Sequence, residues 1–403
     1  MTATRLKLAI ISTHPIQYYS PLFRSLAGRS GLSPRVFYTW SQTQDAPVHD
    51  AGFGRTFSWD VPLLDGHDHE FVPNVAAVPG THHFNGIDNP DLIGRIESWG
   101  ADAVLVFGWN LRSHLAAMRH FKGRRPVFFR GDSTLLDPQP TLRRLARRAW
   151  LRWVYRHVDV ALAVGANNVD YYSWCGLPAA RIALVPHAID TERFGDRRHD
   201  GPARAIRAEL GIPDSSPTLV YAGKFLPKKD PLLLLDAFFD AGAGCHLVLF
   251  GDGPLGDELR RRSLHRPNLR VLPFQNQSAM PVVYRVGDAV VLPSCGPGET
   301  WGLALNEAMA SGRPVIASSR VGAARDLVVE ARSGWTFEAG QRMQLARAIV
   351  QFRDAGPRQI AAMGEYARAH SQRWSIGVAA AALERAVLAH CGRAAPDGVA
   401  LTA

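Results

Sequence analysis

The 403-residue sequence has few cysteines and no long apolar run, and each absence excludes a class of protein. Its four cysteines are scattered, without the spacing of a zinc site or of a disulfide framework, so we expect a reduced, cytoplasmic setting. No stretch approaches the roughly 20 apolar residues of a membrane-spanning helix. The apolar segment 8–11 is too short for a signal-peptide core and predicts a first β-strand.

Two familiar phosphate or metal motifs are also missing. No Gly-x-x-x-x-Gly-Lys-Ser/Thr phosphate loop occurs, and no Asp-x-Asp follows a buried strand. The triplet Asp68-His69-Glu70, preceded by His67, superficially resembles a metal site. We place it on a loop, where it lacks metal-ligand spacing, and expect no metal.

Positive charge exceeds negative charge, with 46 Lys and Arg against 36 Asp and Glu. The net charge of +10 makes nucleic acid, anionic lipid and an anionic nucleotide-sugar candidate partners. An arginine-rich composition that merely reflects a GC-rich genome explains the charge equally well. Hydrophobic residues form 46% of the chain, as in ordinary globular proteins, and the length suggests two or three domains.

Residues 288–317 organise the chain, with the order strand, glycine-rich loop, helix, turn and strand. The helix is expected from about 302 to 310. A loop that enters a helix presents free backbone N–H groups and a positive dipole end, which suit a phosphate. Glu299 and Glu307 stand on the loop and about two helical turns later, so they can hold one extended ligand at two points.

The second half of the chain opens with a similar strand, loop and helix. A strand at 218–222 precedes Gly223-Lys224 and Lys229, and a helix begins near 232. Two cations and a helix start therefore converge on one anion. The next expected strand ends in Gly251-Asp252-Gly253, whose glycines let the backbone approach a ligand.

Several of these motifs carry a family resemblance. Glu-x7-Glu at 299–307, followed by Ala-Met-Ala-Ser-Gly-Arg-Pro-Val, resembles the signature of family-4 glycosyltransferases, which have the GT-B fold. Thr-His-Pro-Ile-Gln-Tyr at 13–18 resembles the opening of a subset of that family. Val-Pro-His-Ala-Ile-Asp at 185–190 resembles its inter-domain passage, with His-Ala in place of Asn-Gly. The resemblance covers the second half closely and the first half loosely.

The resemblance implies a fold with two Rossmann-like, doubly wound α/β domains facing across a cleft. Residues 1–190 would form the acceptor-side domain and residues 191–375 the nucleotide-sugar domain. Residues 376–403 would provide a helix that returns to the first domain, followed by a frayed tail.

The resemblance also implies transfer of a sugar from a UDP- or GDP-sugar with retention at the anomeric carbon, without a metal. Lys224 and Lys229 would offset charge on the leaving diphosphate, with Lys228 as the adjacent alternative. Glu307 would bind the ribose, and Glu299 the donor sugar or its backbone surroundings. The whole expected donor set is Lys224, Lys229, Gly251, Gly253, Gln275, Asn276, Glu299, Thr300, Trp301, Gly302, Leu303 and Glu307.

In the first half, His14 and Asp132 are the candidate catalytic residues. His14 is either a cleft histidine or a packed one, and Asp132, like Arg130, is either a cleft residue or part of a loop network. Relatives often place a histidine where Gly108 stands here. The insertion 41–75 is placed to shape an acceptor pocket.

An arginine-rich helix is expected at 141–157, with Trp150 and Trp153 and no acidic residue. It is either a membrane-surface segment bound to anionic lipid or a packed helix with solvated arginines. The first alternative suits a glycan or lipid-linked acceptor in surface-polysaccharide biosynthesis at the inner face of the membrane, and no nucleic-acid partner is expected. Rival functions are a nucleotide-sugar 2-epimerase, a phosphorylase and a non-catalytic nucleotide-sugar-binding scaffold.

Overall fold

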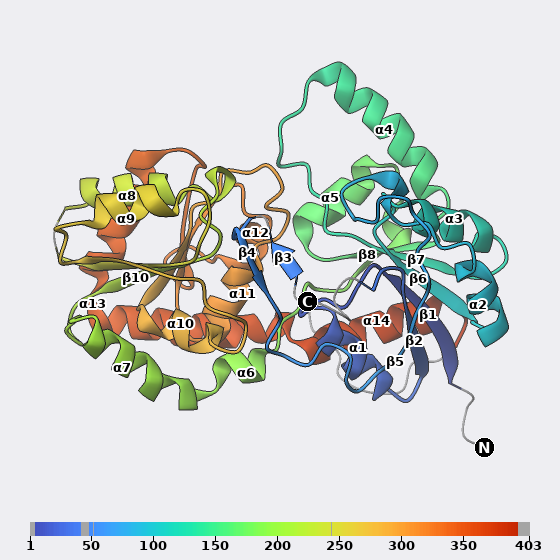
Figure 1. Cartoon of the computed structure of the whole chain (residues 1–403), viewed down its shortest axis with the longest axis horizontal. Helices are drawn as coiled ribbons and strands as arrows, with labels where there is room; N and C mark the ends of the chain where they lie inside the picture. Colours follow the sequence, from blue (N-terminus) through green and yellow to red (C-terminus); the bar gives the residue numbers. More distant parts are fainter. Residues whose placement is uncertain (1–4, 42–47, 51, 243, 394–403) are drawn as a thin grey trace. The chain divides into compact units, whose positions relative to one another are not determined.

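The computed structural model describes residues 5–41, 48–50, 52–242 and 244–393. They form two compact units, each built on a parallel β-sheet covered by helices (Figure 1). Unit 1 contains the described residues of 1–46, 62–188 and 376–403, and unit 2 those of 47–61 and 189–375. The predicted pair of doubly wound α/β domains is therefore confirmed.

Unit 1 is built on a seven-stranded parallel sheet of order β5-β2-β1-β6-β7-β8-β9. Its central strands are runs of Leu, Ile, Val, Ala and Phe that are buried on both faces, as expected where helices cover both sides of a sheet. The strands are β1 Leu6–Ser12, β2 Leu32–Tyr38, β5 Asp68–Phe71, β6 Ala103–Phe107, β7 Val127–Arg130, β8 Val160–Ala163 and β9 Ile182–Leu184.

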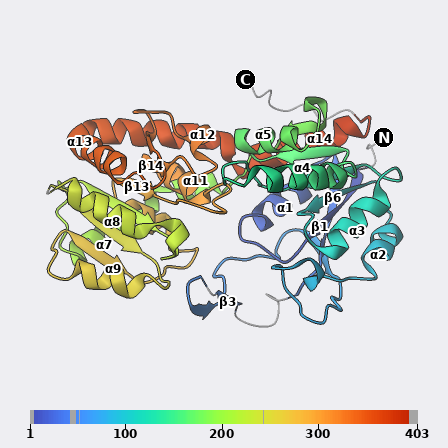
Figure 2. The same ribbon diagram turned by 90° about the horizontal axis from the view of Figure 1, so that it is seen from above.

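The helices of unit 1 include the last helix of the chain, α14, which lies beside α1 (Figure 1, Figure 2). Leu383 and Leu388 of α14 are buried in the core, and burial of each side chain stabilises the fold by about 1.5–3 kcal/mol. The buried Glu384 carboxylate accepts a hydrogen bond from the Gly31 N–H at 2.9 Å. The helices are α1 Ser20–Ala27, α2 Leu92–Trp99, α3 Arg112–Phe121, α4 Thr141–Tyr155, α5 Ala166–Trp174 and α14 Ile376–His390.

The segment Asp68–Phe71 corrects the sequence analysis, because it is the edge strand β5 and not a loop. Its carboxylates pair with arginines: Asp68 with Arg35 at 2.7 Å and Glu70 with Arg95 at 2.5 Å. A single edge strand with alternating polar residues lacks the buried apolar run by which the central strands were predicted.

Unit 2 is built on a six-stranded parallel sheet of order β12-β11-β10-β13-β14-β15, with a separate antiparallel pair, β3 and β4. The strands are β3 Val48–Asp50, β4 Arg55–Phe57, β10 Thr218–Ala222, β11 His246–Phe250, β12 Leu269–Leu272, β13 Ala289–Leu292, β14 Val315–Ser318 and β15 Gly334–Phe337. The helices are α6 Thr191–Gly195, α7 Asp200–Glu209, α8 Pro231–Asp240, α9 Gly256–Ser263, α10 Met280–Val286, α11 Leu303–Ala310, α12 Ala324–Leu327 and α13 Arg342–Ser371. Gly356 interrupts α13 with non-helical backbone angles, just before Pro357.

The strand order fixes where a ligand can bind in unit 2. The order reverses between β10 and β13, and in open parallel sheets ligands bind beyond the carboxyl ends of the strands at such a switch point. The loops after β10 and β13 are those that carry the lysines and the Glu-x7-Glu motif. Within the described ranges, no helix combines the length and the apolar character needed to cross a membrane.

Candidate functional site

The two motif loops of unit 2 meet through a lysine and a glutamate. Lys229, at the end of the 3-10 turn Pro227–Lys229, forms an ion pair with Glu299 from the loop after β13. Ser294 Oγ also donates to the same Glu299 oxygen at 2.8 Å. Lys224 Nζ donates to Asp50 Oδ2 at 2.8 Å. The carboxyl edge of this sheet therefore gathers two ammonium groups and two carboxylates.

Asp230 positions Lys229 at the start of α8. Its backbone is left-handed, with φ of 52°, and its Oδ1 accepts a hydrogen bond from the Leu233 N–H at 3.3 Å. This cap satisfies one of the free N–H groups of the first helical turn. Burial raises the pKa of the Asp230 carboxyl above its usual value.

Gly251 allows the loop after β11 to lie against the loop after β10. A Cβ atom at position 251 would stand 1.9 Å from the Gly223 carbonyl oxygen, so no other residue fits without a backbone shift. Gly253 is similarly close to Phe225, whose N–H donates to the Asp252 carbonyl at 2.9 Å. The glycines thus allow the two loops to pack closely, and their approach to a ligand stays a prediction.

Glu307 lies on α11 and is 2% exposed. Its Oε1 accepts from Gln277 Nε2 at 3.0 Å, and its Oε2 accepts from Tyr284 Oη at 2.6 Å. The carboxylate is therefore held in a fixed orientation by neutral donors. Neither partner was predicted from the sequence, although Gln277 directly follows the predicted Gln275 and Asn276.

The loop between Glu299 and α11 is rigid. Gly302 begins the helix with φ of 94°, a conformation that disfavours side chains. The Trp301 side chain is buried, with its Nε1 donating to Asn306 Oδ1 at 2.8 Å, and its carbonyl accepts a hydrogen bond from the Ala323 N–H at 2.8 Å. The Gly322 N–H also holds the loop by donating a hydrogen bond to the Glu299 carbonyl at 3.1 Å. Thr300 lies in this loop, and Leu303 is the first residue of α11.

The loop after β12 carries Gln275 and Asn276 and is covered by residues from the first half of the chain. Asn276 Nδ2 donates to the Ser58 carbonyl at 2.8 Å, and the Phe53 ring lies 4.5 Å from that of Phe274. The insertion 41–75 was predicted to shape an acceptor pocket. Residues 48–50 and 52–61 belong to unit 2, beside the predicted donor residues; positions 42–47 and 51 lie outside the described residues.

In unit 1, His14 and Asp132 follow β1 and β7, at the same carboxyl edge of the sheet. Burial lowers the pKa of His14 to about 4, so the ring is neutral at pH 7. Its Nδ1 lies 3.0 Å from Thr13 Oγ1. Arg130 is buried and donates to the carbonyls of Val185 and Pro186, which makes it part of a structural network.

Two other histidines of unit 1 are packed. His114 is fully buried, with Nδ1 2.9 Å from the Phe107 carbonyl oxygen and Nε2 3.0 Å from Thr39 Oγ1. His187 stacks on Tyr19 at 5.9 Å, and burial lowers its pKa to about 3. The only sequence signal for this packed histidine was the His-Ala pair at positions 187 and 188, where the family pattern has Asn-Gly.

Helix α4 exposes apolar side chains among its arginines. Leu142, Leu145 and Trp150 are 83%, 57% and 46% exposed, and the first turns project beyond the rest of unit 1 (Figure 1). Trp150 is therefore not a core residue, whereas Trp153 packs in part against the core. The predicted helix 141–157 extends over Thr141–Tyr155.

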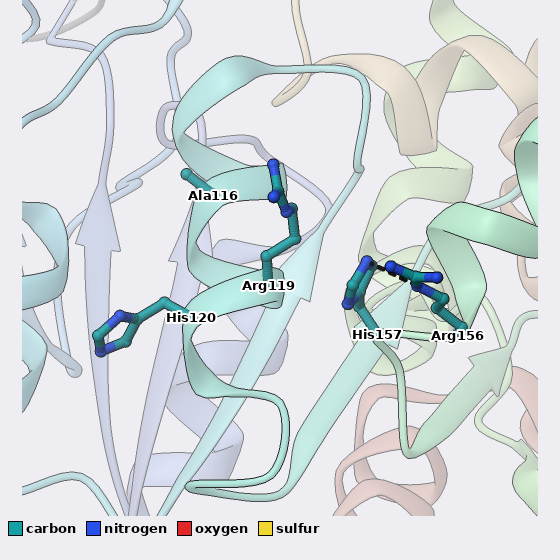
Figure 3. Close-up of a pocket in the computed structure, with 5 residues that line it drawn as sticks. All are labelled: Ala116, Arg119, His120, Arg156 and His157. Atoms are coloured by element: carbon teal, nitrogen blue, oxygen red, sulfur yellow. Dashed lines mark hydrogen bonds between the residues drawn. The ribbon is translucent and has the colours of Figure 1, made fainter.

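A basic hollow of about 400 Å³ lies beside the end of α4. The Arg119 and Arg156 guanidinium groups lie 5.7 and 5.6 Å from the centre of the Trp153 ring. Figure 3 shows Arg119, Arg156 and His157 around this hollow and His120 pointing away from them. Burial, together with the charges of these arginines, lowers the pKa of His157.

Two family models match the chain. The model described as "Glycosyl transferases group 1" matches residues 202–370, and the one described as "Glycosyltransferase Family 4" matches residues 41–193. The matched regions include the second-half motifs and most of the first unit's later strands.

Curated relatives carry the name D-inositol 3-phosphate glycosyltransferase. One from Catenulispora acidiphila is 30% identical over 263 residues, which cover 61% of this chain and 59% of that protein. Another, from Nocardia farcinica, is 27% identical and covers 94% of this chain and 90% of that protein. The match thus spans less than two thirds of the Catenulispora relative's length.

Solved structures share the fold at low sequence identity. Anabaena HepE in complex with UDP and glucose has a TM-score of 0.68 and 18% identity, covering 95% of this chain and 99% of that one. Sucrose-phosphate synthase from Thermosynechococcus elongatus has a TM-score of 0.69 and 18% identity, covering 96% and 100%. The lipopolysaccharide outer core galactosyltransferase WaaB has a TM-score of 0.66 and 14% identity, covering 96% and 100%.

Proposed function

Because this chain belongs to glycosyltransferase family 4 and has the GT-B fold, we propose that it transfers a sugar from a nucleotide-sugar to an acceptor, with retention at the anomeric carbon. One observation carries the proposal. Lys229 and Glu299, 70 residues apart, are in contact at the carboxyl edge of the unit 2 sheet, next to the helix that bears Glu307.

The roles proposed for these residues follow from their charge and place. Lys224 and Lys229 hold the donor diphosphate and offset the charge that develops on it as the sugar leaves. Glu307, oriented by Gln277 and Tyr284, binds the ribose hydroxyls. Glu299 binds the donor sugar. The remaining donor residues approach the ligand through their backbone or meet the base: Gly251, Gly253, Gln275, Asn276, Thr300, Trp301, Gly302 and Leu303.

In unit 1, His14 and Asp132 are the proposed catalytic residues on the acceptor side. The neutral His14 ring can offer both a hydrogen-bond donor and a hydrogen-bond acceptor at pH 7. A non-catalytic scaffold would bind the donor without turnover, and an epimerase would release a free epimer without any acceptor.

We propose a UDP-sugar as the donor, supported by the complexes of Anabaena HepE with UDP and UDP-glucose. The test is calorimetric titration with UDP-glucose and GDP-mannose, followed by NMR of the product formed with added glycan acceptors. We expect UDP-glucose binding, an α-linked product and a rate that EDTA leaves unchanged, since lysines balance the diphosphate. A β-linked product would contradict retention, and loss of rate restored by magnesium would contradict the lysine assignment.

The proposed acceptor is a lipid-linked glycan in surface-polysaccharide biosynthesis, reached by a cytoplasmic enzyme on the inner face of the membrane. The exposed apolar residues of α4, set among arginines, support this proposal. Two fold neighbours named for lipopolysaccharide synthesis, WaaB and WaaG, are consistent with it.

A further inference from the structure

A hairpin encoded in the first half of the chain lies on unit 2 and contacts the loops of the proposed donor site. Strands β3 and β4 form the hairpin, and the chain continues past β4 to Asp60. We call residues 50 and 52–60 the donor strap. None of the motifs described in the sequence includes this segment.

The donor strap contacts the loops after β11 and β12 with both aromatic and polar groups. The Phe274 ring lies 4.5 Å from Phe53 and 4.9 Å from Phe57. Polar contacts extend along the same loops: Arg55 with Asp252 at 3.0 Å, the Ser58 carbonyl with Asn276 at 2.8 Å, and Asp60 with the Ser278 N–H at 2.9 Å. The donor strap therefore lies against the loop that carries Gln275 and Asn276, which is proposed to meet the base of the donor nucleotide.

Asp50 connects the strap to the phosphate-binding lysine. Its Oδ1 accepts hydrogen bonds from the N–H groups of Gly52 and Phe53 at 2.8 and 3.1 Å. This turn leaves Oδ2 directed at Lys224 Nζ, 2.8 Å away. Burial alone would raise the pKa of Asp50, but the hydrogen bond and charge of Lys224 outweigh it and hold the pKa below its usual value. The group is therefore a carboxylate at neutral pH.

We propose that Asp50 is an internal competitor of the donor diphosphate for Lys224. An ammonium group binds a carboxylate and a phosphate oxygen by the same charge-assisted hydrogen bonds, so both ligands use one set of donors. In the free protein Asp50 satisfies Lys224, as Glu299 satisfies Lys229. The arriving diphosphate replaces Asp50, and Asp50 recaptures Lys224 when the nucleotide product leaves. This inference rests on the proposed function.

Asp50→Asn tests the proposal, because the amide keeps Oδ1 for the turn and removes only the charge. We expect the Kd values of UDP and UDP-glucose, measured by calorimetry, to fall about threefold to fivefold, the range of an exposed ion pair. Asp50→Ser is a second variant of the same position, and thermal unfolding checks that each variant is folded.

Two matched variants separate competition from other effects. In a Lys224→Met background, Asp50→Asn should change the Kd by less than about 1.5-fold, because the contested cation is gone. Asp257→Asn removes an exposed carboxylate of the same unit, paired with Arg260, and should leave the Kd unchanged. An unchanged Kd in this control shows that a change in the net charge of the protein does not cause the effect of Asp50→Asn.

Unchanged or weaker nucleotide binding by both Asp50 variants would overturn the competitor role and leave the donor assignment standing. The same holds if Asp50→Asn tightens binding equally in the Lys224→Met background. If neither the wild type nor Asp50→Asn binds a UDP- or GDP-sugar, the proposed function fails and the role of Asp50 fails with it.

Discussion

Glu307 shows how one residue combines a structural and a functional position. A carboxylate that is almost fully buried needs hydrogen bonds, and Gln277 and Tyr284 supply one to each oxygen. These two bonds fix the orientation of the carboxylate that we propose as the ribose ligand. Lys229 differs from Glu307, because its partner Glu299 is itself proposed to bind the donor sugar.

At this scale we predict that Lys229→Ala and Glu307→Ala each lower kcat/KM by at least about 100-fold without unfolding the chain. Loss of a group that stabilises developing charge costs about 2.7–4 kcal/mol of transition-state stabilisation. Steady-state kinetics with UDP-glucose, together with circular dichroism, measures both effects. Lys228→Ala is the matched control and should retain most of the rate. If Lys228→Ala loses as much rate as Lys229→Ala, the choice between the adjacent lysines is wrong.

Among the elements, α4 is unusual because it is amphipathic in sequence but only partly packed. Leu151, Val154 and Tyr155 near its end are buried, whereas Leu142 and Leu145 near its start are exposed. Exposed apolar residues are individually normal, but here they share a helix with five arginines, at 143, 144, 147, 148 and 152, and no acid. A surface of that composition suits an anionic lipid headgroup layer.

We predict that the protein binds liposomes that contain anionic lipid and that binding weakens as salt is raised. Each basic residue near such a surface contributes about 1 kcal/mol. Replacing Arg143, Arg144, Arg147 and Arg152 by Gln, or Leu142 and Leu145 by Ser, should abolish co-sedimentation.

Leu264→Ser removes a leucine of similar exposure, 63%, from unit 2 and should not change liposome binding. Failure of the wild type to sediment with anionic liposomes at low salt would end the membrane proposal.

At the scale of the whole molecule, burial lowers the pKa values of histidines in both units. In unit 1 the pKa values of His14 and His114 fall to about 4 and that of His187 to about 3. Below pH 6.5 the unfolded chain binds protons that the folded unit does not. Their contribution to stability is therefore complete above about pH 6.5 and is lost as the pH falls towards 4.

We predict that the melting temperature falls between pH 6.5 and pH 4.5, and that His187→Asn reduces this fall. Each such histidine contributes at most about 1.4 kcal/mol per pH unit to the free energy of unfolding. Asn stands at this position in the inter-domain pattern that residues 185–190 resemble. His82→Asn changes an exposed histidine and should retain the wild-type pH dependence. Equal pH dependence in wild type and His187→Asn would show that His187 does not titrate on unfolding.

The fold class could be predicted because buried parallel strands are apolar runs, and these alternate with helices along the whole chain. The donor loops could be placed for a related reason: parallel strands bring their carboxyl ends to one edge, so Lys229 and Glu299 had to lie near each other. The assignment of a role to each residue remains a prediction. The edge strand β5 was missed, because one solvated strand carries no apolar run.

The sequence by itself determined the two sheets, their loops and the residue types at the donor edge, since these depend on local periodicity and on turn chemistry. Only the tertiary structure decided which groups those residues contact. Asp50 and Lys224 are 174 residues apart, and Gln277 is 30 residues from Glu307. A contact between distant segments depends on how whole elements pack, and it leaves no periodic trace in the chain.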